Sequence, residues 1–192
     1  MPTFLDPQKL RDPTAGARYL LGAVIERRLD DGTILKGRIA ETESYHQSDP
    51  ASHTYRGPSA RNAAMFGPPG HAYIYFTYGV HWCFNVTAGV EGEGAGVLIR
   101  AIEPLAGIER MREFRKGAPD AQLTNGPGKL AQALAIDKML YGHDLRQPPL
   151  QVYDAGNVKA SSITTATRIG IRLAADELLR FYITDSPYVS KK

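Results

Sequence analysis

Residues 23–45, AVIERRLDDGTILKGRIAETESY, decide the fold of this chain. Stretches rich in β-branched and apolar residues flank the turn DDG at 30–32, and this pattern predicts an antiparallel hairpin of residues 23–29 and 33–43. Alternate side chains of an extended strand share one face, so Glu41, Glu43 and Tyr45 are expected to point the same way. The hairpin therefore ends in a cluster of polar side chains.

Further elements are predicted on both sides of the hairpin. A helix begins at Asp12 and Pro13 and is stopped by Gly22. The other predicted helices cover residues 60–66, 105–117 and 129–136. Strands are predicted over residues 71–78, 81–89 and 96–104, the last stopped by Pro104, and short strands follow that include 167–174 and 178–184. The fold class predicted is α+β: a single domain over residues 1–192, with a curved, mainly antiparallel sheet flanked by helices.

Composition restricts the kind of protein. The 192 residues are 43% hydrophobic and 22% charged, which is ordinary for a globular chain. The single cysteine, Cys83, excludes an intramolecular disulfide and a cysteine-rich zinc site, and favours a reducing cytoplasm. The amino terminus lacks a signal-peptide pattern, and the apolar run 73–90 is interrupted by polar residues, so we expect no membrane span.

The net charge of +3 permits a polyanionic partner without requiring one. Residues 1–96 hold 9 of the 23 basic and 10 of the 20 acidic side chains, so the positive excess lies in the second half of the chain. A solvated surface with a few spare lysines explains the same charge.

Two carboxylates beside an aromatic ring can activate a water molecule, because crowding or burial moves one pKa toward the working range. Glu41, Glu43 and Tyr45 form such a group, although an exposed strand face of solvated charges is the alternative. Arg100 lies within the apolar stretch VLIRAIEP (97–104). A buried guanidinium there would need a carboxylate, Glu43 or Glu41, or a ligand, whereas on an edge strand it would face water.

The stretch YIYFTYGVHW (73–82) is a ladder of aromatic side chains. Tyr73 and Tyr75 are expected on one strand face, Phe76 on the other, and Tyr78 at the turn made by Gly79. Rings on one face can stack a nucleobase, and a ring at a turn can wedge between base pairs. A sheet core rich in tyrosine is the alternative.

The stretch TNGPGKL (124–130) opens a helix with Lys129 in its first turn, which suits a phosphate as well as it suits an ordinary helix start. Other catalytic patterns are missing from the sequence. There is no HExxH, no zinc-deaminase signature, no GxGxxG and no GxSxG. We therefore expect no metal and no cofactor.

Five blocks in order resemble the alkyladenine (3-methyladenine) DNA glycosylase family in its compact bacterial form, over residues 14–184: LLGAVIERRLDDGTILKGRIAETESY (20–45), DPASHTYRG (49–57), RNAAMFGPPGHAYIYFTYGVHWCFNV (61–86), GVLIRAIEP (96–104) and NGPGKLAQALAI (125–136). The resemblance implies a monofunctional enzyme that flips alkylated or deaminated purines out of duplex DNA and hydrolyses the N-glycosidic bond. Its substrates would be 3-methyladenine, hypoxanthine and ethenoadenine, and it would leave an abasic site for base excision repair.

The resemblance also implies roles for single residues. Glu43 would deprotonate the attacking water, with Arg100 helping to hold it. The pocket for the flipped base would be formed by Tyr45, His53, Tyr75 and Asn85, with Asn85 disfavouring the 2-amino group of guanine. Tyr78 would enter the duplex in place of the base, and Arg61 and Lys129 would bind DNA. The sequence departs from the family pattern at Ala60, where a proline commonly precedes the arginine.

The partner implied is double-stranded DNA that contains damaged purines, bound by a monomer in the cytoplasm. Two alternatives stay open. A non-catalytic nucleic-acid-binding module would show the same aromatic and basic surface without turnover. A bifunctional glycosylase with β-lyase activity would need an amine, for which Lys129 is the candidate.

Overall fold

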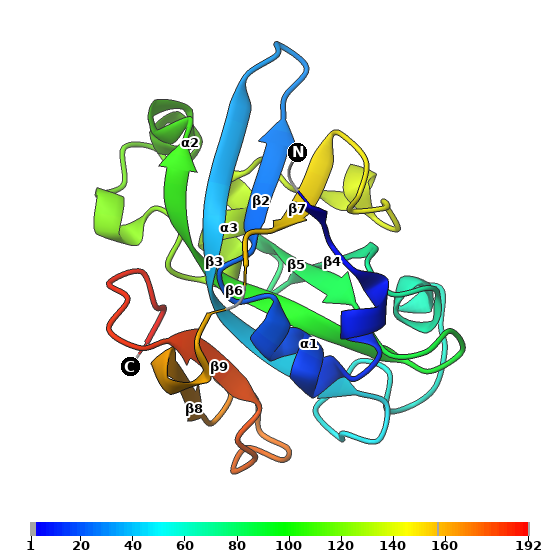
Figure 1. The fold of residues 1–192 in the computed structure, drawn as a ribbon. Helices are drawn as coiled ribbons and strands as arrows, with labels where there is room; N and C mark the ends of the chain where they lie inside the picture. The colour runs from blue at the N-terminus through cyan, green and yellow to red at the C-terminus, as the bar shows by residue number, and fades with distance from the viewer. Residues whose placement is uncertain (1–2, 157, 192) are drawn as a thin grey trace.

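The computed structural model of the chain describes residues 3–156 and 158–191. Within these residues nine strands form one curved antiparallel sheet, which confirms the predicted fold class (Figure 1). The strand order is β1-β7-β2-β3-β6-β5-β4, and β9 pairs with both β3 and β8. The strands are β1 (Thr3–Phe4), β2 (Val24–Arg28), β3 (Ile34–His46), β4 (Ala72–Thr77), β5 (His81–Thr87), β6 (Ala95–Ala106), β7 (Leu150–Asp154), β8 (Ile163–Ala166) and β9 (Arg180–Ile183).

Strand β3 is the organising element of the sheet. Its first half pairs with β2, as the hairpin predicted, and its second half pairs with β9, while β6 runs along its other edge. Register shifts beside Gly37 and Glu41 bend the β3–β6 ladder. The Ile102 side chain of β6 packs directly against the backbone of β3 at Gly37. Only glycine leaves room for it, because a Cβ atom at residue 37 would lie 2.4 Å from Ile102 Cδ1.

Three α-helices and five short 3-10 helices, counted within the described residues, complete the fold. They are α1 (Pro13–Tyr19), α2 (Ile108–Phe114), α3 (Pro127–Ala133), η1 (Pro7–Leu10), η2 (Ala63–Phe66), η3 (Asp120–Gln122), η4 (Lys138–Leu140) and η5 (Ala160–Ser162). Asp12 caps α1 by accepting hydrogen bonds from the Thr14 and Ala15 N–H groups. Thr42 Oγ1 donates to the Ala17 carbonyl at 2.8 Å and so fixes α1 against β3.

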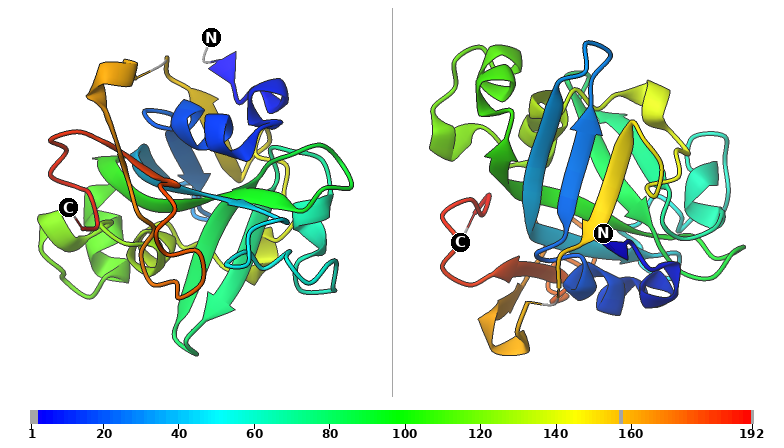
Figure 2. Two further views of the ribbon diagram at one scale, coloured as in Figure 1. Left: turned by 90° about the horizontal axis from the view of Figure 1, so that it is seen from below. Right: turned by 45° about the horizontal axis from the view of Figure 1, so that its top comes forward.

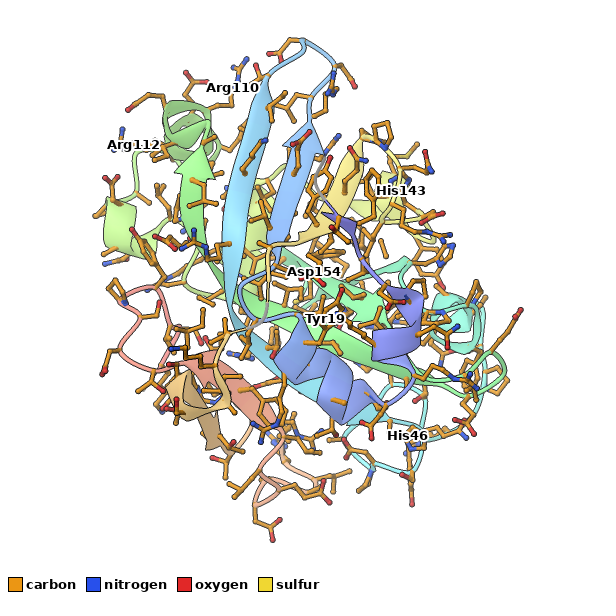
Figure 3. The ribbon with its side chains drawn as sticks, in the orientation of Figure 1. Tyr19, His46, Arg110, Arg112, His143 and Asp154 are labelled. Carbon is orange, nitrogen blue, oxygen red and sulfur yellow. The ribbon has the colours of Figure 1, made fainter. Side chains whose placement is uncertain are left out.

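The core is one apolar cluster between the sheet and its helices. Its largest fully buried members include Phe84 and Phe181. Tyr19 closes the edge of this core, and Figure 3 shows it close to Asp154. The Tyr19 hydroxyl donates to Asp154 Oδ2 at 3.1 Å, and burial, together with this carboxylate, raises the pKa of Tyr19 to about 12. This contact ties α1 to β7.

Three predicted elements differ in the structure. Pro104 does not stop β6, which continues to Ala106. The Ile102 N–H, two residues earlier, points away from β3 to the Thr124 carbonyl, so the N atom of Pro104 also faces away from β3, beyond the end of the pairing with β5, where the ladder needs no donor. Residues 167–174 are not a strand but a loop, since Arg168 turns inward to Asp49. The helix predicted from residue 60 begins at Ala63 as a 3-10 helix, because the Asn62 amide donates to the carbonyls of His53 and Gly57 instead.

The hairpin of β4 and β5 projects from the body of the molecule, as the left view of Figure 2 shows. Tyr78, Gly79 and Val80 form its tip, and all three are exposed. Within the described residues no helix combines the length and the apolar character needed to cross a bilayer.

Candidate active site

A pocket of about 450 Å³ opens between the β4–β5 hairpin, the start of α3 and the loop after β8. That volume lies within the range of about 300–1,000 Å³ common for small-molecule sites. Predicted site residues from several distant segments line it: Tyr45, His53, Tyr75, Tyr78, Asn85, Arg100 and Lys129. The start of α3 can pack this close because Gly128 has no side chain; a Cβ atom there would lie 2.8 Å from His81 Cγ.

Arg100 on β6 pairs with both carboxylates of β3. Its Nη1 lies 3.2 Å from Glu43 Oε1, and its Nε lies 3.3 Å from Glu41 Oε1. The Nε contact is an ion pair without hydrogen-bond alignment, since this atom has no hydrogen-bond partner among the described residues. Arg100 is 6% exposed and both glutamates are fully buried. The alternatives of a solvated glutamate face and a water-facing arginine are therefore wrong.

Both oxygens of the Glu43 carboxylate already accept a hydrogen bond. The Ile169 N–H donates to Oε1 at 2.8 Å, and the Tyr45 hydroxyl donates to Oε2 at 2.8 Å. Burial and the Glu43 charge raise the pKa of Tyr45, so this hydroxyl keeps its proton. Because Glu43 has no solvent exposure, water can reach it only if Tyr45 or the adjoining loop shifts. Each carboxylate oxygen has a second lone pair with which to accept a proton.

Glu41 has a different set of partners. Its Oε1 accepts a hydrogen bond from Arg180 Nη1 at 2.9 Å, and its Oε2 accepts one from the Ser190 N–H at 2.7 Å. Arg180 Nη1 also donates to the Lys191 carbonyl. Two buried carboxylates, Glu41 and Glu43, are thus matched by two buried guanidinium groups, and this balance offsets part of the cost of burying them. Glu41 anchors the chain end beside the site.

Aromatic rings form the walls of the pocket. His53 meets Tyr75 edge to face with ring centroids 4.5 Å apart, and its Nδ1 lies 2.9 Å from the Tyr73 hydroxyl. Burial raises the pKa values of Tyr73 and Tyr75. Both hydroxyls therefore keep their protons near neutral pH. Tyr73 is fully packed, so the tyrosine-core alternative holds for that residue alone.

Asn85 lies on β5 opposite Tyr73 and is 4% exposed. Its Nδ2 donates to the Tyr73 carbonyl at 3.1 Å, which fixes the amide where it lines the pocket. Lys129 is partly buried on the opposite wall, and its Nζ donates to Asn125 Oδ1 at 2.8 Å. Tyr78 is 84% exposed with a φ of 52°, so its ring is held out at the tip of the hairpin. Arg61 is exposed beside Tyr75.

The comparisons with known proteins show the family of the chain. The family model described as Methylpurine-DNA glycosylase (MPG) matches residues 8–187. The chain belongs to this family. A protein of Carboxydothermus hydrogenoformans named "Putative 3-methyladenine DNA glycosylase" is 49% identical over 95% of both chains, and one of the same name from Methanoculleus marisnigri is 47% identical over 95% of both. The protein is a DNA glycosylase, a hydrolase of base excision repair.

Three residues that contribute to the candidate site were not predicted from the sequence. Arg168 is buried, and its guanidinium packs over the Tyr45 ring at 4.7 Å while it pairs with Asp49. The next residue, Ile169, supplies the N–H that Glu43 accepts. The third residue is Arg180, which pairs with Glu41. It could have been predicted in the same way as Arg100, because it also lies inside an apolar stretch, LLRFYIT (178–184). The N–H of Ile169 gives no signal in a sequence.

His46 lies outside this geometry. His46 ends β3 and bonds Ser48 rather than a pocket residue, and Figure 3 shows it at the edge of the molecule. Among the described residues, no group of three or more His, Cys, Asp and Glu side chains is placed to hold a metal ion.

His53 makes the stability of the glycosylase depend on pH. Burial and then the Arg61 charge lower the pKa of His53 below its ordinary value of 6.5. The folded state therefore favours neutral His53, and this contribution is complete above pH 6.5 and is lost as pH falls toward the lower folded pKa. The loss is expected to be small, because the ring is solvent-accessible at the pocket mouth.

Denaturant unfolding at about pH 7.5 and about pH 5.5 measures this contribution. The wild type should lose more stability between the two values than His53→Gln does. His46→Gln, at a histidine outside the pocket, is the control and should behave as the wild type. Equal losses in all three proteins would contradict the role given to His53.

Proposed function

We propose that this glycosylase flips an alkylated purine, above all 3-methyladenine, out of duplex DNA and hydrolyses its N-glycosidic bond with Glu43 as the general base. The observation that supports this most is the placement of Arg100: it lines the aromatic pocket and also pairs with Glu43 at 3.2 Å. A base held in the pocket would bring its sugar toward Arg100, and a shift of Tyr45 or of the adjoining loop would then open Glu43 to the attacking water.

The reaction needs little acid catalysis for a cationic lesion. As the water oxygen bonds to C1′, the C1′–N bond breaks and its electron pair neutralises the positive charge on 3-methyladenine, while the water proton passes to Glu43. The sugar passes through an oxocarbenium-like state, which the neighbouring carboxylate stabilises. The product strand carries an abasic site. Hypoxanthine and ethenoadenine are neutral in DNA and would leave as anions unless they are first protonated, so we expect them to react more slowly.

The pocket contributes binding rather than bond breaking. Flipping costs a few kcal/mol, least for a weakly paired base, and stacking on an aromatic ring returns about 1–3 kcal/mol per base. Tyr45, His53 and Tyr75 would supply this stacking. Every purine has a flat face, so selection against guanine is assigned to the fixed amide of Asn85. Arg61 and Lys129 would contact the phosphates, and the enzyme would act as a monomer on cytoplasmic DNA.

Release of free base from a duplex that contains 3-methyladenine, without any added metal or cofactor, tests the proposal. Parallel reactions with borohydride test the lyase alternative: a trapped covalent complex that disappears in Lys129→Ala would replace simple hydrolysis with β-lyase chemistry. Binding of the lesion duplex without base release would instead support the non-catalytic alternative and overturn the proposal.

Tyr78→Ala tests the flipping step. Loss of the ring that fills the emptied stack should weaken binding of the lesion duplex by about tenfold, within the range of a single stacking contact. Because Tyr78 is 84% exposed, the free energy of unfolding should change by no more than about 0.5 kcal/mol. A variant that unfolds, or one that binds the lesion duplex as the wild type does, would contradict the insertion of Tyr78.

A further inference from the structure

The β4–β5 hairpin carries a second aromatic surface, on the face turned away from the base pocket. Tyr75 and its cross-strand partner Cys83 line the pocket, so the next pair, Phe76 and Trp82, points to the other side. These two rings lie 4.8 Å apart between centroids at an interplanar angle of 50°. The reaction proposed above uses neither of them.

Phe76 and Trp82 form one wall of a shallow cleft, which we term the outer cleft. It is lined by Ala60, Arg61, Ile74, Tyr75, Phe76, Trp82, Lys138 and Tyr141. Phe76 is 44% exposed although it lies inside a strand of the sheet. A large ring left this open on a sheet face is not explained by core packing, and such surface commonly serves binding.

The charges at the outer cleft are positive. Arg61 and Lys138 are both exposed, and neither is paired with a carboxylate among the described residues. The Arg61 guanidinium is held over the cleft by a 3.4 Å hydrogen bond to the Phe76 carbonyl. Asp137, next to Lys138, is occupied in capping η4, where it accepts from the Met139 N–H. Aromatic faces beside unpaired cations are the two parts of a single-strand nucleic-acid site.

The outer cleft is also continuous with the proposed DNA-binding surface. Tyr75 lines both the base pocket and the outer cleft, so a single ring separates the two. Phe76 precedes the tip residue Tyr78 by two positions on the hairpin that projects in Figure 2. A DNA strand that places one nucleotide in the base pocket would therefore pass close to the outer cleft.

We propose that the outer cleft binds an unstacked nucleotide of the DNA strand next to the flipped one. The base stacks on Phe76 and Trp82, and its phosphate is contacted by Arg61 and Lys138. This proposal rests on the proposed function, because it takes the base pocket as the site of the lesion. Neighbouring bases of a duplex are paired and stacked, whereas those of single-stranded DNA are free at little cost. The outer cleft should therefore contribute most to the binding of single-stranded DNA.

Trp82 is the only tryptophan of the chain and reports directly on the outer cleft. Titration of the wild type with a short undamaged oligothymidylate, followed by tryptophan fluorescence, should show saturable quenching that weakens with salt. Phe76→Ala should weaken this binding by about five- to tenfold, the lower part of the range for one stacking contact. Lys138→Ala should weaken it and reduce its dependence on salt.

Phe4→Ala is the matched control. Phe4 is also 44% exposed and lies 5.3 Å from another ring, that of Tyr153, but it is on β1 at the other end of the strand order. If oligothymidylate leaves the fluorescence unchanged, or if Phe76→Ala affects binding no more than Phe4→Ala does, the proposal is overturned. Equal losses of single-stranded and duplex binding in Phe76→Ala would also contradict it.

Base release from a lesion duplex is measured separately, so the two proposals can fail independently. Failure of the wild type to release 3-methyladenine would refute the proposed function, while the oligothymidylate titration would still decide whether the outer cleft binds DNA. Conversely, an enzyme that releases 3-methyladenine but shows no change of Trp82 fluorescence with oligothymidylate would refute only the proposal that the outer cleft binds DNA.

Discussion

Glu43→Gln is expected to slow the release of 3-methyladenine from duplex DNA by about 10²- to 10⁴-fold, the usual contribution of a positioned general base. Glutamine keeps the size of the side chain, its amide oxygen can still accept from the Ile169 N–H, and its NH2 group can donate to the Tyr45 hydroxyl, which in the wild type donates to the carboxylate at 2.8 Å. It cannot take the proton of a water. The rate should therefore fall while binding of the lesion duplex stays within a few-fold of the wild type.

Glu41→Gln is the matched variant two residues earlier; both substitutions remove a buried charge and lower stability, but Glu41→Gln is expected to have little effect on the rate. Glu41 is fully buried and joins Arg100, Arg180 and the Ser190 N–H. Removal of its charge leaves two guanidinium groups with one carboxylate between them. Breaking a buried ion pair costs about 3–5 kcal/mol, and we expect the lower end because the amide still accepts a hydrogen bond.

Denaturant unfolding of the two variants checks this division of roles. Glu41→Gln should lower the free energy of unfolding and should slow base release by the folded protein less than tenfold, through Arg100. If Glu41→Gln instead abolished base release in a stable protein, the two carboxylates would have to exchange the roles given to them.

Much of the fold could be predicted because it depends on local patterns. The turn at residues 30–32 and the alternation through Glu43 and Tyr45 gave the central hairpin, and both glutamates do lie on one side of β3, where they meet Arg100. The apolar stretch around Arg100 predicts either burial or, on an edge strand, exposure to water, and the place of β6 between β3 and β5 decides for burial. What sequence could not distinguish was its partner, and the structure pairs it with both carboxylates.

The remaining features depend on contacts between distant segments. Residues 167–174 have the alternation of a strand, but the ion pair of Arg168 with Asp49, 119 residues away, turns them into a loop. Pro104 is tolerated in β6 because its N atom faces away from β3, on the edge where β5 no longer pairs. The backbone N–H of Ile169 carries no side-chain signal at all. The place of Phe76 in a strand predicts the face of the sheet on which its ring lies. It does not predict the outer cleft, because Arg61 and Lys138 come to that cleft from other segments.

The single-turnover rate of 3-methyladenine release by Glu43→Gln, with enzyme in excess over a fully bound lesion duplex, tests the central claim most directly. Because all substrate is bound, the rate reports the chemical step and not affinity. We expect Glu43→Gln to keep its fold and to release 3-methyladenine at a rate at least about 100-fold below that of the wild type. A rate within about tenfold of the wild type would show that another group activates the water.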